Sequence, residues 1–93
     1  MQLRAVTLPL ALLMVVTAYH KHTPTATGGR PRAGICAGPR RYLNHDAIIA
    51  GRRYRIRDVC PTHLDIWLPT RKQCRLWGRR RLRVRIIRKE GRR

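Results

Sequence analysis

The strongest constraint on the fold is a two-residue alternation of apolar and arginine side chains near the end of the chain. Residues 81–86 have the sequence Arg-Leu-Arg-Val-Arg-Ile. Because successive side chains of a strand point to opposite faces, this pattern predicts a strand with one buried and one solvated face. Residues 53–58 and 64–68 alternate in the same way. Residues 71–77 favour a short helix.

Glycine and proline divide the rest of the chain. Residues 15–19 are rich in β-branched side chains and predict a further strand. Residues 20–39 are rich in Thr, Gly and Pro, so we expect a loop without regular structure there, and residues 40–50 suggest a turn around 44–46. Short strands with such punctuation are typical of an all-β barrel or sandwich. A chain of 93 residues forms one domain with a modest core.

The charge of the chain is strongly positive. There are 22 Lys and Arg residues against 4 Asp and Glu, which gives a net charge of +18. This excess predicts a salt-sensitive attraction to polyanions, and we expect the arginine rows of 53–57 and 81–85 to form a basic face on adjacent strands. A nucleic-acid or anionic-lipid binding module is therefore one interpretation. Aromatic side chains are few and there is no Phe, so no specific nucleic-acid partner is expected.

The cysteines leave their role open. Cys36, Cys60 and Cys74 form no Cys-x-x-Cys pair, and together with His45 and His63 their spacing matches none of the usual zinc patterns. We therefore expect no metal and no cofactor. In an oxidising compartment, Cys60 and Cys74 are the preferred disulfide pair because both flank the candidate site described below. The alternative is three small core residues.

The N-terminal segment has two interpretations. Residues 5–18 are uncharged and mostly apolar, follow Arg4, and end in small residues that suit signal-peptidase cleavage. The run is too short for a comfortable transmembrane helix. It is either a cleaved signal or a retained anchor followed by the first strand, and both predict export to the periplasm, cell envelope or exterior, in a bacterium or from a phage. We expect a signal-like or anchor segment at 1–14, a barrel at 15–88 and a basic tail at 89–93.

The few acidic residues are the candidates for chemistry. They are Asp46, Asp58, Asp65 and, in the basic tail, Glu90. Asp58 ends one predicted strand and Asp65 lies near the start of the next, so the short link between them brings the two carboxylates near each other. Paired carboxylates are what cleavage of a glycosidic bond requires. Simple ion-pairing or solubilising roles are the alternative.

Five segments, in order along the chain, carry a resemblance to a known family. They are residues 16–19 with the Thr-Ala-Thr-Gly loop 25–28, residues 45–51, residues 57–61, residues 63–68 and residues 76–86. The chain resembles the three-aspartate (3D) domain over roughly residues 15–87, and the Asp-Val-Cys-Pro segment is also similar to rare lipoprotein A and barwin-like barrels. The resemblance implies a small six-stranded double-psi β-barrel, with the Gly/Pro-rich loop after its first strand.

The resemblance also implies a function on peptidoglycan. The 3D fold occurs in lytic transglycosylases, in which an aspartate general acid cleaves the glycan strand. On this resemblance Asp65 is the general acid, and Asp58 positions the substrate or controls the protonation of Asp65. The partner is the peptidoglycan glycan strand, and a non-catalytic, expansin-like binder of cell-wall glycan is the alternative.

Four further residues are implied as substrate contacts. Thr17 and Tyr19 lie on the first predicted strand and are expected to line the groove. Asp46 takes the place of the first of the three family aspartates. His45 is expected to contact the glycan or to orient an acid.

Overall fold

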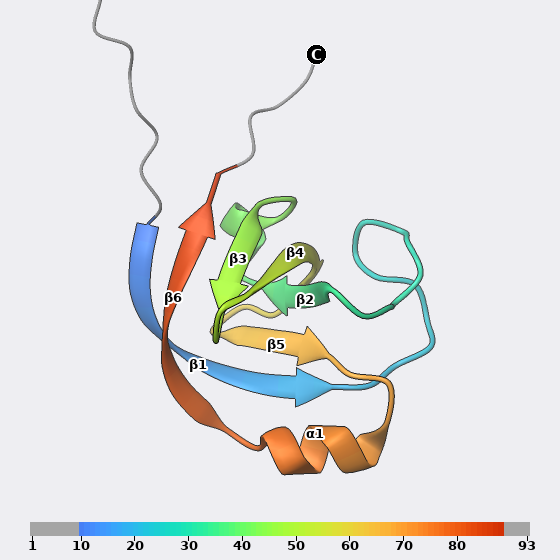
Figure 1. Ribbon diagram of the computed structural model, residues 1–93. Coiled ribbons are helices and arrows are strands. Elements are labelled where there is room, and N and C mark those ends of the chain that lie inside the picture. Colours follow the sequence, from blue (N-terminus) through green and yellow to red (C-terminus); the bar gives the residue numbers. More distant parts are fainter. Residues whose placement is uncertain (1–9, 89–93) are drawn as a thin grey trace, which may run out of the picture.

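The computed structural model of the protein describes residues 10–88, which form a closed barrel of six strands in the order β1-β5-β2-β4-β3-β6 (Figure 1). The predicted all-β barrel, with a Gly/Pro-rich loop after the first strand, is confirmed. The elements are β1 (Leu10–Tyr19), β2 (Ile35–Gly38), a 3-10 turn (Arg40–Tyr42), β3 (Asp46–Ile49), β4 (Arg52–Val59), β5 (Leu64–Trp67), α1 (Arg71–Trp77) and β6 (Arg80–Ile87).

Two long antiparallel strands form one side of the barrel. β1 pairs with β6 from Leu10 opposite Ile86 to Val16 opposite Arg80, and the two strands curve together in Figure 1. The barrel also contains two parallel pairs, β1 with β5 and β2 with β4. The predicted helix is confirmed as α1, which lies beside β1, and the indole Nε1 of Trp77 donates to the carbonyl of Val16 at 3.1 Å.

The core consists of the inward-facing residues of the strands. On β4 the burial alternates, with Tyr54 and Ile56 buried between arginines, as the period of two predicts. Burying one Leu, Ile or Val side chain contributes about 1.5–3 kcal/mol, so a small number of such residues supplies most of the favourable free energy of folding. The largest fully buried aliphatic side chains are Val16, Ile49, Ile56, Leu64, Ile66 and Val84.

The first strand begins earlier than the sequence predicted. β1 starts at Leu10, so the expected boundary at residue 15 falls inside the strand. Its pairing with β6 provides the reason, because Leu10 through Val15 are in register with residues of β6. The segments 1–9 and 89–93, where the rest of the signal-like segment and the basic tail were expected, lie outside the described residues. Among residues 10–88, no helix is long and apolar enough to cross a membrane.

The expectation of a structureless loop over residues 20–39 is wrong for residues 35–38, which form β2. All four residues of β2 are buried, and the strand lies between β4 and β5. A strand buried on both faces has no alternation, so its sequence gives no period of two. Gly38 is required by close packing, since a Cβ there would lie 2.8 Å from Cδ2 of Leu64.

The expectation that the two arginine rows lie on adjacent strands is wrong. β3 separates β4 from β6, and Ile48 of β3 pairs with Arg53 on one side and with Arg85 on the other. β3 and β4 are joined by a tight turn at Ala50 and Gly51, both with positive φ angles of 51° and 80°.

Candidate functional site

The two candidate aspartates flank the same residue of β2. Ala37 pairs with Asp58 of β4 on one side and with Asp65 of β5 on the other. Cys36 pairs with Ile56, so the register with β4 skips Arg57 between one pair and the next. Such an irregularity bends a strand and changes the direction of a side chain. It explains how Asp58, which continues the inward-facing row of β4, reaches the neighbourhood of Asp65.

Asp58 is held as an ionised carboxylate. Lys21 Nζ lies 2.8 Å from its Oδ2, and the Tyr19 hydroxyl donates to the same oxygen at 3.2 Å. Its Oδ1 accepts from the backbone N–H of Ala26 at 2.9 Å and of Val59 at 3.0 Å. Burial alone raises the pKa of Asp58, but the hydrogen bonds from Lys21 and the two backbone amides outweigh it and hold the pKa below the ordinary value.

Asp65 has the opposite electrostatic environment. The hydroxyl of Thr17 donates to its Oδ1 at 2.8 Å, and His63 Nε2 lies 3.1 Å from that hydroxyl oxygen. Burial raises the pKa of Asp65, and the negative charge of Asp58 raises it further; the Thr17 hydrogen bond and His63 oppose this only in part. The two carboxyl groups therefore have pKa values shifted in opposite directions.

One strand face organises both aspartates. Thr17 and Tyr19 are two residues apart on β1, so they project from the same face. Thr17 binds Asp65 and Tyr19 binds Asp58. Burial and then the negative charge of Asp58 raise the pKa of the Tyr19 phenol well above its ordinary value, so the phenol stays a hydrogen-bond donor at neutral pH.

Two residues of this cluster, Lys21 and His63, were not predicted as site residues. Lys21 follows Tyr19 by two positions, and His63 precedes Asp65 by two. Continuing the period of two beyond the predicted strands would therefore have placed Lys21 on the same side as Tyr19, and His63 on the same side as Asp65. The two residues were missed because both positions were assigned to loops.

The cysteines lie around this cluster as free thiols. The expected disulfide between Cys60 and Cys74 is not formed: Cys60 Sγ lies 3.5 Å from His63 Nδ1 in the β4–β5 connection, whereas Cys74 belongs to α1. Cys36 is a core residue, and burial raises its pKa to about 12. Among residues 10–88, no group of three His, Cys, Asp or Glu side chains is placed to hold a metal ion.

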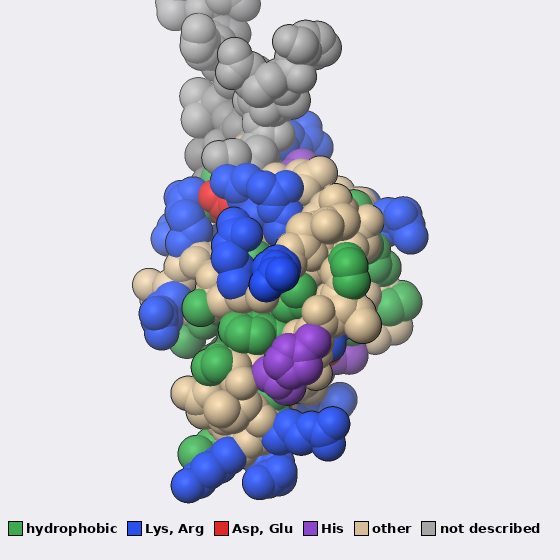
Figure 2. All heavy atoms as spheres, turned by 90° about the vertical axis from the view of Figure 1, so that its right-hand side faces the viewer, with side chains coloured by type: hydrophobic (Ala, Val, Ile, Leu, Met, Phe, Trp, Pro, Cys, Tyr) green, Lys and Arg blue, Asp and Glu red, His purple; other side chains and the backbone are tan. Residues whose placement is uncertain are grey.

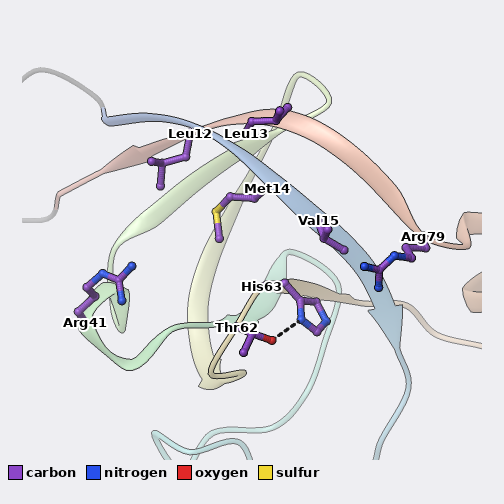
Figure 3. Close-up of a pocket in the computed structure, with 8 residues that line it drawn as sticks. All are labelled: Leu12, Leu13, Met14, Val15, Arg41, Thr62, His63 and Arg79. Atoms are coloured by element: carbon purple, nitrogen blue, oxygen red, sulfur yellow. Dashed lines mark hydrogen bonds between the residues drawn. The ribbon is translucent and has the colours of Figure 1, made fainter.

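A cavity of about 560 Å³ adjoins the cluster at His63 (Figure 3). Four consecutive residues of β1, Leu12 to Val15, form one wall. Arg41 and Arg79 flank the cavity from opposite sides, and the Thr62 hydroxyl lies 2.9 Å from His63 Nδ1 between them. The volume lies within the usual range of small-ligand sites, about 300–1,000 Å³.

Asp46 and His45 belong to another part of the barrel. Asp46 lies on β3, which β4 and β2 separate from β5, and it is only 2% exposed and ion-paired with Arg53 and Arg55. The ring of His45 lies 6.5 Å from that of Tyr42, its buried Nδ1 has no hydrogen-bond partner, and burial lowers its pKa. The structure thus gathers Thr17 and Tyr19 with Asp58 and Asp65, and leaves Asp46 and His45 outside.

Comparison with protein-family models, with curated proteins and with solved structures gives no match to this chain.

Proposed function

We propose that this protein acts on peptidoglycan glycan strands as a 3D-type barrel related to lytic transglycosylases, with Asp65 as the general acid. In this proposal Asp65 protonates the glycosidic oxygen between the MurNAc and GlcNAc sugars. The resulting carboxylate then assists attack by the MurNAc 6-hydroxyl, which gives the anhydro product. Asp58 stays ionised, positions the substrate and maintains the protonation of Asp65.

The observation that carries the proposal is the unequal pairing of two carboxylates that flank Ala37. Asp58 has a lysine and two backbone N–H groups as partners. Asp65 instead accepts a hydrogen bond from one hydroxyl group, and the negative charge of Asp58 raises its pKa. A general acid must be protonated near the working pH, and carboxyl pairs whose pKa values are pushed apart have this division of roles. Despite the net charge of +18, the pKa of Asp65 is raised.

The surface charge supports an anionic polymer as the partner. Figure 2 shows Lys and Arg side chains gathered in the upper and lower parts of one face, with hydrophobic and His side chains between them and acidic side chains visible at a single small spot. Such a surface attracts the anionic polymers of a bacterial envelope. Export to the periplasm, the envelope or the exterior is part of this proposal, because the substrate lies there.

The test is digestion of purified peptidoglycan sacculi, with anhydromuropeptides measured by mass spectrometry. We expect product from the wild type and a loss of about 10²-fold or more in Asp65→Asn, which removes the proton donor. Asp58→Asn should move the pH optimum downward, because the charge of Asp58 raises the pKa of Asp65. Glu90→Gln, which removes an acidic side chain of the basic tail, is the control and should cleave like the wild type.

Three results would redirect the proposal. Product formation that survives Asp65→Asn excludes this residue as the general acid. Sedimentation with sacculi without any anhydro product supports the alternative, a glycan binder of the expansin kind. Tight, salt-dependent DNA or anionic-vesicle binding without affinity for sacculi would favour the basic binding module.

A further inference from the structure

Half of β1 has an open edge. β1 pairs with β6 from Leu10 to Val16, but within residues 10–88 its register with β5 begins only at Val16, opposite Leu64. Before that point, the side of β1 that faces away from β6 has no strand partner. Alternate backbone N–H and C=O groups on this side are free to bind another extended chain.

The cavity lies along this edge. Its β1 wall consists of four consecutive residues, Leu12 to Val15, and the β4–β5 connection closes it at Thr62 and His63 (Figure 3). A wall of consecutive residues includes side chains of both strand faces and therefore the backbone edge between them. The cavity continues the line that β5 takes beside β1, so an occupant would occupy the position of a missing strand.

We propose that this cavity binds a short acidic peptide in extended conformation by adding it to the open edge of β1. Resting on the proposed function, the peptide is the stem peptide that the glycan strand of peptidoglycan carries. Its backbone pairs with residues 12–15, and its carboxylates bind the guanidinium groups of Arg41 and Arg79. Addition of a strand to a sheet edge is a general mode of peptide recognition.

The lining of the cavity matches this chemistry. Leu12, Met14 and Val15 supply apolar contacts suited to small methyl side chains. The two arginines lie on opposite sides, Arg41 in the 3-10 turn and Arg79 in the connection between α1 and β6. Both arginine side chains are exposed, and Arg41 also lies over the Tyr42 ring at 4.7 Å. Arginine is the side chain best suited to bind a carboxylate through paired hydrogen bonds.

The location of the cavity links it to cleavage. His63 lines the cavity and also contacts Thr17, which binds Asp65. A stem peptide held along residues 12–15 therefore places its MurNAc sugar toward Thr17 and the aspartates. The cavity would select peptide-bearing glycan over bare glycan.

The experiment titrates the full chain with a synthetic stem tetrapeptide, followed by backbone amide NMR and calorimetry. We expect shifts in residues 12–15 and a loss of affinity of about tenfold in the double variant Arg41→Gln/Arg79→Gln. The matched control Arg71→Gln/Lys72→Gln removes the same charge from the exposed surface of α1 and should bind like the wild type. Circular dichroism establishes that both variants are folded.

The outcomes separate this site from the proposed function. Equal binding by the wild type and the arginine double variant, or no binding of the tetrapeptide, overturns the peptide site even if sacculi are cleaved. Arginine-dependent peptide binding with no cleavage or binding of sacculi supports the site and rejects the glycan function. If the peptide site and the glycan-cleaving function are both correct, the arginine double variant should lose activity on whole sacculi. It should keep its activity on glycan strands stripped of peptide by an amidase.

Discussion

The hydroxyl of Tyr19 donates a hydrogen bond of 3.2 Å to Oδ2 of Asp58, a residue 39 positions away in the sequence. Two residues before Tyr19, the hydroxyl of Thr17 makes the equivalent bond to Asp65. A single face of β1 thus holds both carboxyl groups, and it holds them in different protonation environments.

Thr17→Val should raise the pKa of Asp65. The Thr17 hydroxyl donates to the ionised form and so lowers this pKa, and valine keeps the shape of the side chain without the donor. The measurement is an NMR pH titration of the Asp65 carboxyl carbon. Thr23→Val, at an exposed loop position, is the control and should leave the titration unchanged. A lower or unaltered pKa in Thr17→Val would mean that the hydroxyl does not stabilise the carboxylate.

Asp58→Ala should lower the free energy of unfolding by about 3 kcal/mol at neutral pH. The substitution leaves the backbone N–H groups of Ala26 and Val59 without their acceptor and Lys21 without its partner. Urea unfolding followed by circular dichroism measures the loss. In the variant Lys21→Met, the amides keep their acceptor, so the loss should be smaller; an equal loss would place the whole effect in the ion pair.

The two aspartates should give opposite pH dependences of stability. The pKa of Asp58 lies below the ordinary value of 3.8, so its contribution is present above pH 3.8 and is lost as the pH falls below it. The pKa of Asp65 lies above 3.8, so its contribution is complete below pH 3.8 and is lost as the pH rises through the folded-state pKa.

Asn variants isolate these two terms when unfolding is measured from pH 2 to 7. The stability difference between the wild type and Asp58→Asn should shrink toward acid pH. Asp65→Asn should gain relative to the wild type as the pH rises above 3.8. The same trend in both variants would contradict the opposite pKa shifts.

Gly38→Ala should destabilise the barrel by about 1–3 kcal/mol, because its Cβ would lie 2.8 Å from Cδ2 of the buried Leu64 and 3.4 Å from Cγ2 of Ile56. Thermal unfolding measures this change. Gly29→Ala is the matched control, because its Cβ would approach only Thr25 Oγ1 at 4.0 Å. Equal melting temperatures for Gly38→Ala and the wild type would show that Leu64 moves aside at little cost.

Local alternation was sufficient to place β4, β5 and β6, since each has one buried and one solvated face. It failed at β2, whose four residues are all buried and therefore carry no alternation. It also failed for the arginine rows, because a period of two specifies the face of a side chain but not the neighbouring strand. The insertion of β3 between β4 and β6 depends on pairing between distant segments.

By itself, the sequence determined an all-β fold, a barrel or a sandwich, and named the two aspartates that lie together, because strand periodicity and the scarcity of acidic residues are local properties. Only the tertiary structure decided that Asp46 is buried against Arg53 and Arg55, away from Asp65, and that Lys21 neutralises Asp58. The register shift beside Ala37 and the open edge of β1 were also decided there. The physical reason is that register and charge pairing arise from contacts between segments that are distant in the chain, whereas local patterns contain no information about partners.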